Sequence, residues 1–208
     1  MTALQDAPPA LTDTLALDRG AQDLLFRNAR SANAFTDTPV TEDQVAAIYD
    51  LVKWAPTAMN TQPLRILLVR SADARQRLIP HLAPGNRTKA AGAPLGAVLA
   101  ADLDFHEHLP VVFPHFPGAK EVFADPAGRA EAARFNAGLQ IGYFLLGVRA
   151  AGLAAGPMGG FDAHGMDEEF FAGTSLRSLL VVNIGRPAAG AWFDRSPRLA
   201  QDQVLHSV

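Results

Sequence analysis

The feature that most constrains this chain is one long helical pattern, residues 128–151, whose central part, residues 137–148, is almost entirely apolar. A helix that crosses a membrane needs about 20 apolar residues. This run is shorter, contains Gln140 and lies between Arg134 and Arg149. We therefore expect a buried helix of a globular protein. Because it is apolar on nearly every side, it needs cover on more than one side.

The composition is compatible with a single core around such a helix. The 208 residues are 49% hydrophobic and 19% charged, which suits one domain with a sizeable core. The net charge of −3 gives no basic surface for nucleic acid. The absence of Cys excludes disulfides, thiolate metal ligands and Cys nucleophiles, and fits a cytoplasmic protein. Residues 1–18 lack the pattern of a signal peptide and are expected to form a flexible arm before one domain, residues 19–208.

Helical and strand-like patterns alternate along the chain. Apolar residues at helical spacing predict helices at residues 23–30, 42–54, 72–82, 128–151 and 167–171. Short apolar runs predict strands at residues 66–69, 95–101, 153–155 and 178–184, with irregular structure at residues 105–126. Thr41, with Gln44 three residues later, has the spacing of a capping box. The interleaving predicts an α+β or α/β fold with a small central sheet.

The connection at residues 55–63 is longer than the 2 to 6 residues, roughly, that join a helix to a strand. It carries Thr57, Asn60, Thr61 and Gln62 between two prolines. Thr and Asn favour turns through their own hydrogen bonds, so a capped surface loop is one interpretation. The other is a loop that holds amide and hydroxyl groups against a polar ligand.

Other segments combine cations, amides and glycines. They are residues 30–33 (RSAN), residues 86–89 (NRTK) in a loop before a strand, residues 156–160 (GPMGG) after the long helix, and Arg195 and Arg198 in the tail. Together they offer cations for a phosphate, amides for a ring edge, and a glycine loop that a flat ligand can approach closely. The FHEH tract at residues 105–108 has two His at i,i+2, which lie on different faces of a helix, so we predict no metal site.

The order and spacing of these blocks resemble the nitroreductase family of FMN-dependent oxidoreductases, from about Arg27 onward. The resemblance is carried by ARSANAFTDTPV, KWAPTAMNTQP, GNRTKAAGAP, FHEHLPVVFPH, ARFNAGLQIGYFLLGVRAAGLAAGPMGGFD and DRSPRL. It implies an α+β fold, a three-layer α/β/α sandwich around a small, mostly antiparallel sheet. Within the family the chain is most similar to the malonic semialdehyde reductases.

The resemblance also implies which residues contact the flavin. The phosphate and ribityl contacts would be Arg30, Ser31, Asn33, Arg195 and Arg198. The contacts at the pyrimidine end would be Asn86 and Lys89, and the backbone near the reactive nitrogen would be that of Pro157, Met158, Gly159 and Gly160. The loop that lines the flavin from the partner-subunit side would supply Pro56, Thr57 and Asn60. Asn33 and Gly159 depart from the family pattern, since many relatives have a basic residue and a Glu there.

The function implied by the resemblance is ping-pong hydride transfer. NADPH or NADH would reduce FMN, and a small aldehyde acid would then be reduced, 3-oxopropanoate to 3-hydroxypropanoate. Lys89 is the expected cation beside the pyrimidine edge of the reduced flavin, and no side chain stands out as a catalytic acid or base. The alternatives are a broad nitroaromatic or quinone reductase and a flavin-binding protein without turnover.

The long helix also predicts a homodimer with a shared flavin site. Gly138 and Gly142, one turn apart, would let a second helix approach closely, and glycine costs a helix roughly 1 kcal/mol relative to alanine. The tail from Arg195 onward would reach over the partner and bring Arg195 to a phosphate site. The alternative is that the chain's own sheet covers this helix entirely.

Overall fold

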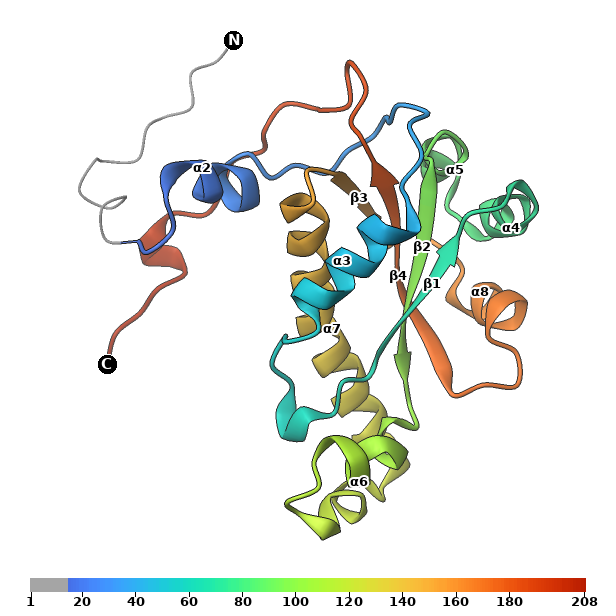
Figure 1. Cartoon of the computed structure of the whole chain (residues 1–208), viewed down its shortest axis with the longest axis vertical. Helices are drawn as coiled ribbons and strands as arrows, with labels where there is room; N and C mark the ends of the chain where they lie inside the picture. Colours follow the sequence, from blue (N-terminus) through green and yellow to red (C-terminus); the bar gives the residue numbers. More distant parts are fainter. Residues whose placement is uncertain (1–14) are drawn as a thin grey trace.

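A computed structural model describes residues 15–208 and has one antiparallel sheet at its centre (Figure 1). The sheet consists of β1 (Leu64–Val69), β2 (Leu95–Asp102), β3 (Ala154–Met158) and β4 (Leu176–Gly185), in the order β1-β2-β4-β3. Each strand pair is antiparallel. The pairing of β2 with β4 shifts between Leu99 and Ala100, which marks a bulge.

Helices cover both faces of the sheet, as a three-layer α/β/α sandwich requires. Every residue of β2 is buried, so its two faces must both be covered. On one face lie α3 (Glu42–Val52) and α7 (Pro126–Ala150). On the other lie α4 (Ala72–Leu78), α5 (Pro84–Ala91) and α8 (Ala163–Phe170). The predicted α+β sandwich with a small antiparallel sheet is confirmed.

Shorter elements complete the chain. They are α2 (Arg19–Gln22), the π-helical turn η1 (Asp23–Arg27), α6 (Leu109–Val112), and the 3₁₀ turns η2 (Ala58–Asn60), η3 (Ile79–His81), η4 (Phe105–His108), η5 (Pro117–Ala119), η6 (Glu121–Phe123) and η7 (Gln201–Gln203). The capping box of α3 is confirmed: the Gln44 N–H donates to Thr41 Oγ1 at 3.1 Å, and the Thr41 N–H donates to Gln44 Oε1 at 3.0 Å.

Four predicted elements are wrong in extent or type. The helix predicted at residues 167–171 is α8 (Ala163–Phe170), which begins four residues earlier. The first helix begins at Arg19 and ends at Arg27 instead of spanning residues 23–30. Residues 86–89 lie in helix α5, not in a loop, and Pro84 at its first turn already has a helical φ. Residues 156–158 continue strand β3, so only Gly159 and Gly160 follow it as a loop. Pro157 is tolerated because β3 is an edge strand.

Helix α7 is covered by its own chain on one side only. Phe144 and Val148 are buried against the sheet, and a Cβ on Gly147 would lie 2.4 Å from a methyl of Val52 in α3. Phe135 and Tyr143 are exposed to 67% and 44%, and no atom lies within 4 Å of a Cβ built on Gly138 or Gly142. The alternative that the chain's own sheet covers the whole helix is therefore wrong. The exposed side is an apolar strip with small residues at its centre.

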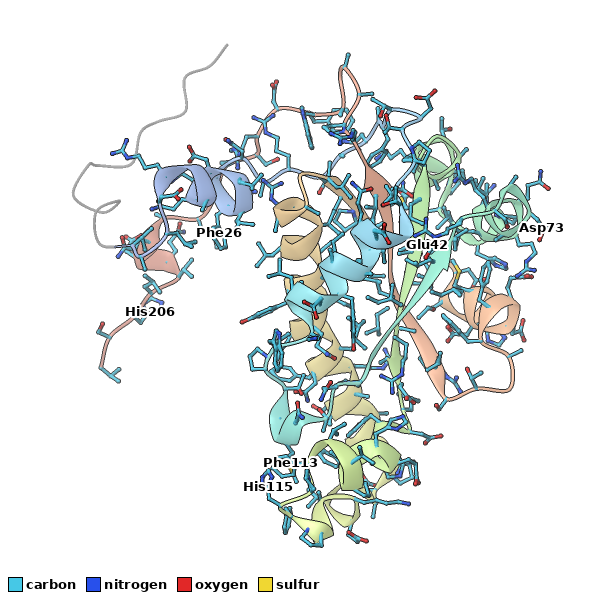
Figure 2. All side chains as sticks on the ribbon, viewed as in Figure 1. Phe26, Glu42, Asp73, Phe113, His115 and His206 are labelled. Atoms are coloured by element: carbon cyan, nitrogen blue, oxygen red, sulfur yellow. The ribbon has the colours of Figure 1, made fainter. Side chains whose placement is uncertain are left out.

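The N-terminal helices and the tail lie together beside the sandwich. Figure 2 shows Phe26 on the N-terminal helices and His206 in the tail on the same side of the molecule, away from the sheet. The flexible arm predicted for residues 1–18 falls mostly on residues 1–14, outside the described residues, and Asp18 already caps α2 by accepting the Ala21 N–H. Within residues 15–208, no helix is long and apolar enough to cross a membrane.

Candidate functional site

An open cavity of about 410 Å³ lies where the chain after η1, helix α5, strand β3 and the tail meet. Half of the predicted flavin contacts line it: Arg30, Ser31, Asn33, Lys89, Pro157, Arg195 and Arg198. Its other lining residues are Ala29, Phe193, Asp194 and Ser196. The structure thus brings together segments that are far apart in the sequence. In the single chain, Arg195 and Arg198 of the tail line this cavity beside Arg30 and Ser31.

The cavity is lined by cations that no acid neutralises directly. In the described part of the chain, no carboxylate lies within 4.0 Å of the charged nitrogens of Arg30, Lys89, Arg195 or Arg198. Arg30 donates to the Phe193 carbonyl at 2.7 Å, and Arg195 donates to the Arg27 carbonyl. Such bonds fix the guanidinium groups and leave their charge in place. The arrangement suits an anion with several oxygens, such as a phosphate ester.

Arg149 adds a further cation that sequence reasoning missed. It lines an adjoining cavity of about 240 Å³ together with Arg30, Ser31, Pro157 and Arg198. Burial and the repulsion of Arg195 lower the pKa of its guanidinium, so the two charges are close. Arg149 donates to the carbonyls of Leu24 and Leu25, which ties the end of α7 to the N-terminal helices. The sequence signal for this residue was an arginine at the end of a long apolar helix.

Helix α5 presents Lys89 to the main cavity, and Asn86, one turn earlier, contacts the turn after β3. Asn86 Nδ2 donates to the Gly160 carbonyl at 3.0 Å, which holds the turn after β3 against α5. A Cβ on Gly160 would lie 3.3 Å from Asn86 Nδ2, so a side chain there would disturb this contact. The Lys89 ammonium lies 5.9 Å from the centre of the Phe193 ring, a cation–π distance. The helical geometry of α5 therefore positions both residues.

Met158 and Gly159, the remaining predicted contacts in residues 156–160, differ in orientation. The Met158 side chain is buried, and its sulfur accepts a hydrogen bond from Asn183 at 3.7 Å, so it belongs to the core. Gly159 is exposed and has open space around it. Only the backbone of Met158 is able to face a ligand, whereas Gly159 leaves room for close approach.

Pro56, Thr57 and Asn60 lie at a different place in the chain. They sit at η2, which Figure 1 shows beside α6, near the end of the sheet opposite to α5 and β3. Asn60 Nδ2 donates to the Val112 carbonyl at 2.7 Å, and Thr57 Oγ1 accepts the Gln62 N–H at 3.2 Å. None of the three lines the cationic cavities. Within one chain the predicted contacts therefore form two separate groups.

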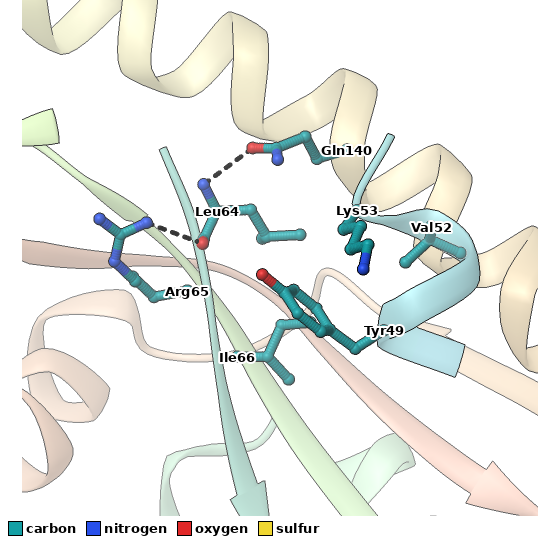
Figure 3. A pocket seen from close by; sticks show the side chains of 7 residues that line it. All are labelled: Tyr49, Val52, Lys53, Leu64, Arg65, Ile66 and Gln140. Atoms are coloured by element: carbon teal, nitrogen blue, oxygen red, sulfur yellow. Dashed lines mark hydrogen bonds between the residues drawn. The ribbon is translucent and has the colours of Figure 1, made fainter. Parts of the chain in front are cut away.

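A further cavity of about 420 Å³ runs along β1 and was not predicted (Figure 3). Its lining comes from α3, β1 and α7: Tyr49, Val52, Lys53, Leu64, Arg65, Ile66 and Gln140. Gln140 accepts the Leu64 N–H at 2.9 Å, which explains the single amide in the apolar part of α7. In Figure 3 Arg65 extends from the opposite side of β1 to Leu64 and Ile66. This cavity has no cluster of cations like that around Arg195.

Residues 105–116 form the turn η4, helix α6 and the chain that follows it. The rings of Phe113 and His115 lie 3.9 Å apart in this segment (Figure 2). His106 is buried and His108 is exposed, so the two His of the FHEH tract face different surroundings. In residues 15–208, no group of three or more His, Asp or Glu side chains is placed to hold a metal ion.

The fold and the cavity define the class of protein: an α/β/α sandwich with a cationic site at one end of its sheet. The chain belongs to the nitroreductase family, whose model matches residues 26–186. A Streptomyces coelicolor protein, named as a candidate NADH dehydrogenase/NAD(P)H nitroreductase, is 61% identical over 94% of this chain and 100% of its own length. A Leptothrix cholodnii protein with the same kind of name is 48% identical over 91% of this chain and 96% of its own length.

Solved structures share the fold at low sequence identity. A candidate nitroreductase from Bacillus subtilis superposes with a TM-score of 0.82 at 18% identity, over 92% of this chain and 100% of the other. A candidate nitroreductase from Exiguobacterium sibiricum, solved in complex with FMN, superposes with a TM-score of 0.78 at 18% identity, over 94% and 99% of the two chains.

We expect inorganic phosphate to bind in the cationic cavity and to raise the Tm of the ligand-free protein. A ligand at ten times its Kd stabilises the folded state by about 1.4 kcal/mol. Arg195→Gln should weaken this effect about tenfold in phosphate concentration, because one charge-assisted contact is lost. Thermal unfolding across a phosphate series at constant ionic strength measures it.

The matched control is Arg77→Gln on α4, whose guanidinium pairs with Glu169 at 2.8 Å and lines neither cationic cavity. It should leave the phosphate dependence unchanged. An equal response to phosphate in Arg195→Gln and the native protein would contradict an anion site at Arg195.

Proposed function

We propose that the protein is an FMN-dependent NAD(P)H oxidoreductase. The observation that carries the proposal is the open cavity with four cations from three segments, none of which has a direct acidic partner. Membership of the nitroreductase family supports it, as do the names of its relatives, which mention NADH and NAD(P)H. The Exiguobacterium sibiricum protein that binds FMN has the same fold.

The residues around the cavity fit FMN by chemistry. Arg30, Arg195 and Arg198 would bind its phosphate, with the Ser31 hydroxyl and the Asn33 amide beside it. Asn86 and Lys89 would face the pyrimidine edge, and the backbone from Pro157 to Gly160 would face the ring near its reactive nitrogen. FMN, when bound, supplies the hydride-transfer chemistry.

The chain's own part in the reaction is electrostatic. Lys89 is half-buried at the edge of the cavity, and its positive charge would lie where negative charge appears on reduction. A fixed cation in such a place needs no reorganisation at the moment of transfer. The proposal names no side chain as the catalytic acid or base. The proton for the product would come from water or from another group of the protein.

For the acceptor we propose a small aldehyde acid, 3-oxopropanoate, which would be reduced to 3-hydroxypropanoate. The blocks of sequence that resemble malonic semialdehyde reductases support this choice. A broad nitroaromatic or quinone reductase is the second candidate, and the nitroreductase names of the relatives favour it. The two differ in acceptor preference and share the reaction with NAD(P)H.

The active unit in this proposal is a homodimer that shares each flavin site between subunits. The apolar strip on α7, with Phe135, Tyr143 and open space at Gly138 and Gly142, is a surface that a second copy would cover. Trp54, two residues after the end of α3, is also exposed. The loop that carries Asn60 would then line the flavin held by the cations of the other copy.

The direct test of the function is spectroscopic. The purified protein should carry non-covalent FMN, because there is no Cys for a thioether link, and denaturation should release the yellow colour. NADPH or NADH should bleach it within one turnover, and 3-oxopropanoate should restore the colour faster than quinones or nitroaromatics do. Reoxidation without any preferred acceptor would favour the broad reductase. Absence of bleaching would contradict the enzyme, and a colourless protein that FMN does not reconstitute would contradict the cofactor.

Lys89→Ala should slow flavin reduction more than it weakens FMN binding. Loss of a fixed charge at a comparable site costs on the order of 2 to 4 kcal/mol of transition-state stabilisation, so reduction should slow roughly 30- to 1000-fold. Stopped-flow reduction by NADPH and fluorimetric FMN titration separate the two effects. Arg87→Ala on the same helix, whose guanidinium bonds the Leu82 and Pro80 carbonyls away from the cavity, is the control. An unchanged reduction rate would remove Lys89 from this role.

Gly142→Leu should dissociate the dimer and release flavin together. A leucine on the open strip of α7 would hold a second helix at a distance. Sedimentation and the FMN content of the same sample measure the two outcomes. Gly142→Ala is the matched control, because a methyl group keeps close approach possible and the dimer should persist. A monomeric variant with a full complement of FMN would refute the shared site.

A further inference from the structure

A small cavity of about 170 Å³ lies beside the η2 loop, separate from the cationic cavity. Its lining residues are Thr61, Gln62, Arg65, His108 and Val112. Their side chains provide a hydroxyl, an amide, a guanidinium and an imidazole around one apolar contact. Bulk water takes about 30 Å³ per molecule, so the space suits a few waters or the end of a small organic acid.

One of these groups is buried without a partner. Thr61 is only 2% exposed, and its Oγ1 has no hydrogen-bond partner in the structure. Leaving a buried hydroxyl unpaired costs about 1 to 3 kcal/mol. Native proteins therefore keep few such groups, and those that exist call for a bound partner or a function.

The guanidinium at this cavity is held in a fixed orientation. Arg65 Nη2 donates to Asp102 Oδ2 at 2.6 Å, and Nη1 donates to the carbonyls of Gln62 at 2.9 Å and Leu64 at 3.0 Å. Asp102 is itself buried and accepts from Ser175 Oγ at 2.7 Å. These bonds use three of the five N–H groups of Arg65. Among the described hydrogen bonds none uses the others, which are therefore free for a ligand.

The backbone beside the cavity is strained. Met59, Asn60 and Gln62 have φ values of 50°, 53° and 42°, in the left-handed region that non-glycine residues rarely occupy. Each such residue costs on the order of 1 to 3 kcal/mol and persists only where its surroundings hold it. The Asn60–Val112 and Arg65–Gln62 hydrogen bonds supply that restraint. Strain of this kind gathers at ligand-binding sites.

We infer that this cavity is the subsite for the carboxylate of the acceptor substrate. A carboxylate there would take charge-assisted bonds from the unused N–H groups of Arg65 and a hydrogen bond from Thr61 Oγ1. His108, with its ring nitrogen 3.8 Å from Asp102, lies at the exposed mouth and can donate a further bond. Asp102 opposes an incoming anion, but the donors from Arg65, Ser175 and the Asp104 N–H are committed to its charge.

The position fits a two-ended substrate. Asn60, on the same loop, is the proposed contact to the flavin of the other copy, so the cavity and that flavin contact share one loop. The inference rests on the proposed function, and it names the residues that would select a small aldehyde acid over a neutral aldehyde. A neutral acceptor would leave the Thr61 hydroxyl unpaired, as in the free protein.

The test is the selectivity of the holoenzyme for charged over neutral aldehydes. In Thr61→Val and Arg65→Lys, the ratio of kcat/KM for 3-oxopropanoate to that for propanal should fall about tenfold or more. Valine keeps the shape of Thr61 without its hydroxyl, and lysine keeps the charge that pairs with Asp102 but loses the fork of donors. Arg177→Lys is the matched control, since Arg177 on β4 bonds the Thr174 and Leu176 carbonyls and lies outside the cavity. The ratio should not change there.

A binding measurement tests the carboxylate subsite without turnover. 3-Hydroxypropanoate should raise the Tm of the native holoprotein and of Arg177→Lys, and should have at most a tenth of that effect, at equal concentration, on Thr61→Val. Without ligand, Thr61→Val should be as stable as the native protein or more so, because an unpaired buried hydroxyl is removed. Equal protection of Thr61→Val, or an unchanged selectivity ratio, would overturn the subsite. Failure of NADPH to bleach the protein would instead overturn the proposed function, so the two failures are distinguishable.

Discussion

The complete burial of β2 is the constraint on which the rest of the structure depends. It pairs with β1 on one side and β4 on the other, and every residue along it is buried. Such a strand is stable only between two layers of helices. Small residues such as Gly96 and Ala97 let those layers approach closely. The packing then fixes where α5 and β3 end, and with them the positions of Lys89 and Pro157 at the cationic cavity.

Much of the fold could be predicted from local sequence because each signal had one physical meaning. Buried apolar runs became β2 and β4, and Thr41 with Gln44 became the cap of α3. The prediction of a loop at residues 86–89 was wrong because α5 is short and polar. It has little apolar periodicity to distinguish it from a loop. The strand predicted at residues 153–155 ended too early because Pro157 reads as a strand breaker. Proline is excluded from central strands but not from an edge strand such as β3.

The site was predictable only in part because it is assembled by the tail. Nothing local indicates that Arg195 meets the Arg27 carbonyl or that Arg30 meets that of Phe193, since these bonds join residues more than 160 positions apart. The resemblance to a family supplied that grouping, and the structure supplied the charge balance. Arg149, which lies at the same place, was not among the residues that the resemblance supplied, and its position depends on how the end of α7 meets the N-terminal helices.

The separation of Asn60 from the cations connects the open face of α7 to the chemistry. Asn60 lies in a loop whose left-handed residues are held by hydrogen bonds to Val112 and Arg65, so the loop is not free to swing across the sheet to its own cavity. If both groups contact one flavin, they must come from two chains. The strip around Gly138 and Gly142 is the surface on which a second chain would lie, because closely packed helices need small residues at their crossing. In the proposed dimer, the strain at η2 and the uncovered apolar face of α7 would have one explanation: each chain would carry half of a site that the pair completes.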